Sequence, residues 1–180
     1  WSQELTVEQS LEEYVKASML LDILRASGLV PLAPGFEHTV FEASVGYDLA
    51  GIAGPKVQGF LRGLIDARPI VDRLRREIPD EHRRYRDLDF RTRVVSGVTL
   101  STFHGCPPGE IAAIAELLLR EHHLSCVLKL NPTLLGRDAL LGLLHQRLGV
   151  RDLVVPEHAF ARDLGWEQAL SLLDHLDAGI

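Results

Sequence analysis

The sequence predicts an α/β fold in which parallel strands alternate with helices. From Val94 onward, short apolar runs rich in β-branched residues alternate with helical patterns of ten or more residues, which is typical of βαβ units. The loops that follow the helices are short, as such units require. Polar residues gather where the apolar runs end, and parallel βα proteins collect their functional groups at those strand ends.

The length and composition of residues 1–180 are typical of a single domain. Its 46% hydrophobic and 24% charged residues are ordinary for a globular chain of 180 residues. A formal net charge of −6 argues against nucleic-acid binding, and no apolar run reaches the roughly 18 residues of a membrane span. The chain starts at Trp1 without a signal-peptide pattern, so we expect a piece of a longer protein. Its two cysteines form no CxxC motif and are too few for an iron–sulfur cluster, which indicates the reducing cytoplasm.

The N-terminal half begins with a predicted helix. Thr6 and Gln9 have the spacing of a capping box, and Gly28 is a typical end for the helix that follows. After a loop punctuated by proline and glycine, residues 39–49 have the period-two pattern of a strand. Residues 57–64 then predict a short helix.

Residues 66–93 differ from the rest because they contain nine arginines, several acids and two prolines. The pattern predicts a short helix near 71–77, followed by an exposed excursion. Two interpretations stay open for this arginine-rich segment: a solvated surface, or a docking surface for another subunit or domain.

The C-terminal half shows the alternation most clearly. Its predicted strands are 94–103, 125–133 and 152–158. Its predicted helices are 107–121, 137–148 and 166–176. Proline in the first turn of the helix at 107–121, with Glu110 near the positive end of the helix dipole, suits a helix start.

Lys129 is an unusual residue for the interior of a strand. Because side chains alternate along a strand, Lys129 and Asn131 face one side, and Leu128 and Leu130 face the other. With the leucines under outer helices, the lysine would point inward, where its charge needs a partner. A carboxylate, a phosphate or an electron-rich cofactor ring could be the partner of this charge.

The strand predicted near 41–48 also has a polar face, made by Glu42, Ser44, Gly46 and Asp48. An ion pair of Lys129 with Asp48 or Glu42 is therefore the alternative to a ligand-binding lysine. Gly46 leaves a gap in the middle of the face. The gap permits close approach of a ligand or of neighbouring backbone, or else marks a bend.

Cys106 stands at the predicted junction of a strand and a helix, after Gly105 and before Pro107. A helix N-terminus and the nearby His104 would both lower the pKa of the thiol, which suits proton transfer or nucleophilic attack. The alternative is a small apolar residue in a tight turn. Cys126 starts a buried strand and is interpreted as core filler.

Several residues are potential metal ligands, but their spacing matches no known zinc pattern. They are His104, Cys106, His122, His123, Glu157 and His158. The adjacent pair of histidines closes a helix, at the end where βα proteins do not place sites. We therefore expect no metal site.

Four stretches of the sequence resemble the selenate reductase subunit family, from Trp1 to about Asp163. They are W-S-Q-E-L-T-V-E-Q-S-L-E-E-Y-V-K-A, S-V-G-Y-D-L-A-G-I, V-T-L-S-T-F-H-G-C-P-P-G-E-I and K-L-N-P-T-L-L-G. These large bacterial proteins are related to the glutamate synthase small subunit and to dihydropyrimidine dehydrogenase. The resemblance implies that residues 1–180 form a single partial (β/α)8 TIM barrel, with an arginine-rich excursion at 66–93.

The resemblance also implies a flavin site in the intact barrel. In the FMN-binding barrels of dihydroorotate and dihydropyrimidine dehydrogenases, strands ending in S-C-P and K-L-x-P are similar to residues 101–107 and 129–132. The implied cofactor-binding residues are Lys129, Asn131, Ser101 and Asp48, and the implied catalytic residues are Cys106 and His104. FAD, NADPH and 4Fe-4S centres would lie in other domains of the parent chain.

Three functions follow from these expectations. The first is a segment of the flavin-type barrel of a cytoplasmic multidomain oxidoreductase that transfers electrons. The second is an inactive barrel that acts as a scaffold between redox subunits, with molybdenum-enzyme subunits as partners; the altered strand tip P-E-H-A-F favours it. The third is an aldolase-like lysine that forms a Schiff base through Lys129.

Overall fold

A computed structural model describes residues 4–35, 38–102 and 106–179 of the chain. The chain divides into two compact units, which we describe separately. The first unit contains Trp1–Ala43 and Ala53–Gly97, and the second contains Ser44–Ile52 and Val98–Ile180.

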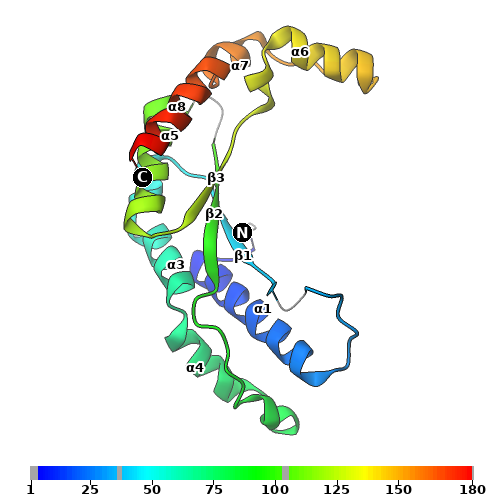
Figure 1. Ribbon diagram of the computed structural model, residues 1–180, viewed down its shortest axis with the longest axis vertical. Helices are drawn as coiled ribbons and strands as arrows, with labels where there is room; N and C mark the ends of the chain where they lie inside the picture. Colours follow the sequence, from blue (N-terminus) through cyan, green and yellow to red (C-terminus); the bar gives the residue numbers. More distant parts are fainter. Residues whose placement is uncertain (1–3, 36–37, 103–105, 180) are drawn as a thin grey trace. The chain divides into compact units, whose positions relative to one another are not determined.

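A parallel three-stranded sheet has the strand order β1-β2-β3, so that β2 is central (Figure 1). The strands are β1 at Phe41–Val45, β2 at Val95–Ser101 and β3 at Ser125–Lys129. The central strand is the most buried of the three, since Val95, Val98 and Leu100 are all inaccessible to solvent. Strands and helices alternate along the chain, which confirms the predicted α/β class.

The first unit is built on the long helix α1, Val7–Ser27. Thr6 caps its start: the Oγ1 atom accepts a hydrogen bond from the Gln9 N–H at 3.2 Å, and Gln9 Oε1 accepts one from the Thr6 N–H at 2.8 Å. Gly28 ends the helix with a φ of 63°, which glycine adopts without steric cost. Both ends of the helix are those the sequence predicts.

Helix α1 packs against α3 (Pro55–Ile65) and α4 (Arg68–Glu77) in this unit (Figure 1). Burial of apolar side chains holds the three helices together. The buried residues are Val15, Met19, Val57, Phe60, Leu61, Leu64, Val71 and Leu74. At the same interface the rings of Tyr14 and Phe60 meet edge to face, with 5.9 Å between centroids.

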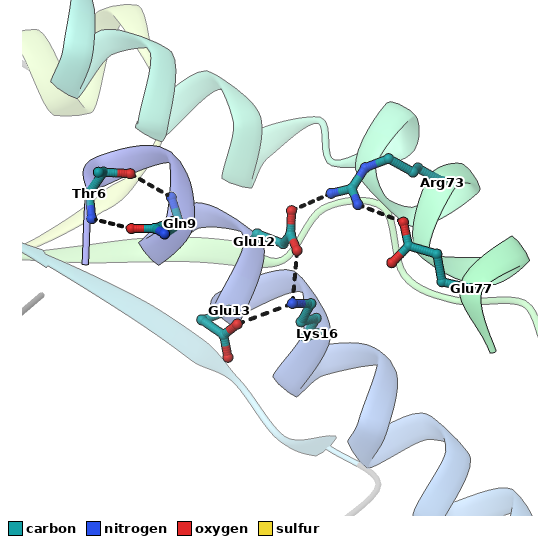
Figure 2. A network of polar contacts seen from close by, with 7 residues as sticks. All are labelled: Thr6, Gln9, Glu12, Glu13, Lys16, Arg73 and Glu77. Carbon is teal, nitrogen blue, oxygen red and sulfur yellow. Dashed lines mark hydrogen bonds and ion pairs between the residues drawn. The ribbon is translucent and has the colours of Figure 1, made fainter. Parts of the chain in front are cut away.

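Charged side chains add a surface network between α1 and α4 (Figure 2). The Glu12 carboxylate accepts hydrogen bonds from Lys16, at 2.8 Å, and from Arg73, which also reaches Glu77 at 2.7 Å. The bonds to Lys16 and then to Arg73 lower the pKa of Glu12. Because water screens these exposed charges, the network adds little to the apolar packing beneath it.

The arginine-rich segment, residues 66–93, is held together by its own side chains. The Arg75 guanidinium donates hydrogen bonds to the carbonyl oxygens of Arg86 and Leu88, the second at 2.9 Å. It also lies 5.1 Å from the centre of the Phe90 ring, which is buried. These contacts hold the end of α4 to residues 86–90 of the same segment, whereas residues 79–84 between them are exposed.

The remaining helices and turns lie between and after the strands. The α-helices are α2 (Leu49–Ala53), α5 (Pro108–Glu116), α6 (Arg137–Leu141), α7 (Glu157–Arg162) and α8 (Trp166–Gly179). The π-helical turns η3 (Leu117–Glu121) and η5 (Gly142–Arg147) extend α5 and α6, and the 3-10 turns are η2 (Asp80–Tyr85) and η4 (Pro132–Leu135). No helix of the described ranges is long and apolar enough to cross a membrane.

Helices α5 and α8 form the core of the second unit together with β3. Their buried residues are Ile111, Ile114, Ala115, Ala169, Leu172 and Leu176. Leu118 and Leu124 complete this core at the turn that leads into β3. The helices thus cover the face of β3 that carries Leu128.

The strand predicted at 152–158 is wrong. Residues 151–152 form a turn, 153–156 have no regular structure, and Glu157 already begins α7. A strand needs a neighbour for its backbone groups, but the Leu153 carbonyl oxygen lies 3.0 Å from His145 Nε2, and Pro156 has no N–H to donate. Val154 is 83% exposed, so apolar composition alone does not create a strand here.

Candidate active site at the strand ends

Lys129 ends β3 on the face opposite the covering helices. Leu128 and Leu130 line a cavity of about 610 Å3 together with residues of α5 and α8. Because side chains alternate, Lys129 lies on the other face, where it is exposed. This is the alternation that the sequence predicts for the three residues.

The backbone of Lys129 is fixed to the end of β2, whereas its amine makes no hydrogen bond or ion pair within residues 4–35, 38–102 and 106–179. Its carbonyl oxygen accepts hydrogen bonds from the Thr102 N–H at 3.3 Å and from Thr102 Oγ1 at 3.1 Å. Within the described residues no ion pair joins the amine to Asp48 or Glu42. Because the side chain of Lys129 is exposed, a ligand can reach it on this face.

Gly46 follows β1 and lies close to Ser101, the last residue of β2. A Cβ atom at Gly46 would stand 3.3 Å from both the Cβ and the carbonyl oxygen of Ser101. The missing side chain thus lets the ends of two neighbouring strands approach each other, which is one of the two predicted reasons for a glycine here. Ser101 itself is half-buried.

Asp48 and Asn131 occupy the loops that leave β1 and β3. Asp48 lies beyond the end of β1, and its Oδ1 atom accepts a hydrogen bond from the Gly51 N–H at 2.8 Å. Asn131 is half-buried, and its carbonyl oxygen accepts the N–H of Leu134 at 3.1 Å to open the turn η4. Asp48 is thus partly engaged in its own turn.

Cys106 is a buried thiol two residues before the start of α5, with only 5% of its surface exposed. Burial, followed by the negative charges of Glu110 and Asp48, raises its pKa from 9.0 to about 11. The predicted lowering of this pKa is therefore wrong, because burial and the two nearby carboxylates all raise it. His104, the other predicted catalytic residue, lies outside the described residues.

Glu110 is a residue of the site that the sequence did not single out for function. Its Oε1 atom accepts a hydrogen bond at 2.8 Å from the N–H of Leu49, the first residue of α2. An acidic residue in the first turn of a helix interacts favourably with the helix dipole. From the sequence alone, this interaction was the only role assigned to Glu110. The bond shows that the side chain also reaches a second loop.

The segments at the ends of the strands carry a cation, hydrogen-bonding groups and a protonated thiol. Lys129 can stabilise negative charge on a bound group, and Ser101 and Asn131 can hydrogen-bond it. A thiol with a pKa near 11 holds its proton at neutral pH, so it suits proton donation rather than nucleophilic attack. Within the described ranges, no group of three or more His, Cys, Asp or Glu residues has the geometry of a metal site.

Comparison with known proteins shows which family and which relatives the chain is similar to. The family model described as "Oxidoreductase YgfK, N-terminal TIM-barrel domain" matches residues 1–179. Two relatives named "Putative oxidoreductase YgfK", from Escherichia coli K12 and Escherichia coli O157:H7, are each 36% identical over 197 aligned positions. These alignments cover 99% of this chain and 19% of each relative, so the chain spans about a fifth of their length. No solved structure matches the chain.

Proposed function

Because the chain belongs to the YgfK N-terminal TIM-barrel domain family of oxidoreductases, we propose that it supplies part of a flavin-binding barrel to a multidomain electron-transfer enzyme. The observation that carries this proposal is the exposed amine of Lys129, at the end of a parallel strand and on the face away from the helices. Functional groups of barrel enzymes collect at this end of the strands. The resemblance to selenate reductase subunits belongs to the same proposal, although no residue here points to selenate.

FMN would supply reversible hydride and electron transfer at this site. The residues present fit the polar edge of a flavin ring: Lys129 would hold negative charge, and Asn131 and Ser101 would donate or accept hydrogen bonds. Cys106 would donate a proton to the substrate, since its thiol is protonated at neutral pH. FAD, NADPH and 4Fe-4S centres would belong to the other four-fifths of the parent protein.

The proposal is tested on the full-length parent protein by counting FMN per chain after release from the purified protein. Lys129→Met removes the charge and keeps the length of the side chain, and we expect it to lower the FMN content at least about tenfold. Lys56→Met is the matched control, because Lys56 is an exposed lysine of the first unit. Equal FMN content in the Lys129 variant and the control would exclude Lys129 from cofactor binding.

A second candidate function is a scaffold between redox subunits. It is favoured by the C-terminal segment, where the predicted strand tip at 152–158 is a loop and a short helix. A wild-type parent protein that retains no FMN, yet copurifies with a molybdenum-enzyme subunit, would support the scaffold and overturn the flavin barrel. Borohydride trapping with carbonyl compounds tests the Schiff-base alternative at Lys129 in the same preparation.

A further inference from the structure

One carboxylate joins the loop after β1 to the helix after β2. Glu110, in the first turn of α5, accepts the hydrogen bond from the N–H of Leu49, 61 positions earlier in the sequence. Leu49 begins α2, and the first N–H groups of a helix have no partner within the helix. Glu110 therefore satisfies a backbone donor that belongs to the neighbouring strand end.

Both of the joined segments carry a residue of the candidate active site. Asp48 directly precedes Leu49, and its own bond to the Gly51 N–H fixes the turn. Cys106 is buried and lies just before α5, four positions before Glu110 in the sequence. Glu110 thus links the segment after β1 to the start of α5.

We propose that Glu110 is a positioning residue, which ties the two strand-end segments together and sets the electrostatic surroundings of Cys106. The catalytic meaning of this role rests on the proposed function, in which Cys106 donates a proton. Among the described residues, the charged groups that act on the thiol are Glu110 first and Asp48 second, and both raise its pKa. A carboxylate that is bonded to the Leu49 N–H keeps its charge at a fixed place beside the thiol.

Two variants of Glu110 separate its charge from its hydrogen bond. Glu110→Gln retains an oxygen that accepts the Leu49 N–H but removes the charge, whereas Glu110→Ala removes both. Glu116→Gln is the control, because this acid lies on the same helix but pairs with Arg120 at 3.4 Å. All variants are made in the full-length parent protein.

The first readout is the pH dependence of iodoacetamide alkylation at Cys106, followed by mass spectrometry of its peptide. The shape of the pH profile reports the thiolate fraction, whereas the absolute rate also reflects access to the buried thiol. Relative to its own high-pH plateau, we expect alkylation of Glu110→Gln at pH 8.5 to be about threefold to tenfold faster than in the wild type. That change corresponds to a midpoint lower by roughly half to one pH unit. Glu116→Gln should follow the wild-type profile.

The second readout is hydrogen exchange at the Leu49 amide. We expect Glu110→Ala to exchange at least about tenfold faster there, and Glu110→Gln to stay close to the wild type. An unchanged pH profile in Glu110→Gln, or unchanged Leu49 exchange in Glu110→Ala, would overturn the proposal. If Glu110→Ala does not fold, the pH profile of Glu110→Gln decides alone.

These outcomes are distinguishable from failure of the proposed function, because neither readout requires a flavin. A parent protein without FMN would overturn the flavin barrel and leave the result for Glu110 intact. Conversely, a parent protein that loses FMN on substitution of Lys129 but shows no effect of Glu110 would retain the flavin site and exclude the positioning role.

Discussion

The Thr133 hydroxyl donates a hydrogen bond of 2.6 Å to Oδ2 of Asp163, and both side chains are buried. Thr133 lies in the turn after β3, and Asp163 follows α7, so the bond fastens the end of the candidate-site strand to the segment that leads into α8. A hydrogen bond to a charged, buried acceptor is among the stronger polar contacts of a protein.

Thr133→Val should therefore loosen this part of the second unit. Valine keeps the shape of threonine but leaves the buried carboxylate without this donor, at a cost of about 1–3 kcal/mol. Hydrogen exchange of residues 131–136 and 160–165 measures the corresponding increase in local opening. Thr133→Ser retains the hydroxyl and is the control. If the valine variant is as protected as the serine variant, the bond contributes nothing to this region.

The free energy of unfolding should depend on pH in part through the titration of Cys106. Its pKa is raised in the folded chain from 9.0 to about 11, so the folded chain holds this proton more tightly than the unfolded chain does. The stabilisation is complete below about pH 9 and is lost as the pH rises through about 11. A shift of this size corresponds to at most about 3 kcal/mol. Urea unfolding at several pH values, compared with Cys106→Ser, measures it.

Serine at position 106 does not titrate in this range, so the difference between the two pH profiles separates the Cys106 thiol from the lysines, the tyrosines and Cys126, which both proteins share. The free energy of unfolding of the wild type should fall more steeply above pH 9 than that of Cys106→Ser. Parallel profiles would show that the thiol titrates normally in the folded chain.

Local features of this chain could be predicted from its sequence. The cap at Thr6, the end of α1 at Gly28 and the opposite faces of Leu128 and Lys129 depend on residues within a few positions of one another. The regular alternation of strands and helices is likewise local, and the match to a TIM-barrel family confirms the fold class it predicts.

Features that depend on distant residues could not be predicted. The pKa of Cys106 is raised partly by Asp48, which precedes it by 58 positions, and the sequence gives no measure of its burial. The bond from Leu49 to Glu110 joins two separate strand ends. Residues 153–155 are apolar, but a strand also requires a neighbour at hydrogen-bonding distance.

Arg75 should be far more important for the arginine-rich segment than its neighbour Arg76. Arg75→Met removes the donors to two carbonyl oxygens and the contact with the Phe90 ring, while the methionine keeps part of the apolar stem. We expect residues 84–90 to exchange amide hydrogens at least about tenfold faster in this variant. Arg76→Met is the control, since that side chain is exposed and makes no hydrogen bond, ion pair or ring contact with the described residues. Equal exchange in the two variants would show that the segment holds together without Arg75.

Gly46→Ala should destabilise the end of the sheet. The added Cβ would stand 3.3 Å from two atoms of Ser101, one of which is a backbone oxygen that cannot turn aside. Overpacking of this kind costs about 1–3 kcal/mol. Urea unfolding of the variant and the wild type measures the loss, and the exchange rates of the Ser101 and Thr102 amides locate it.

At Gly59, within α3, an added Cβ meets nothing within 4 Å, so Gly59→Ala should instead stabilise the helix by about 0.5–1 kcal/mol. A Gly46 variant that gains stability as Gly59→Ala does would mean that the two strand ends are not in close contact.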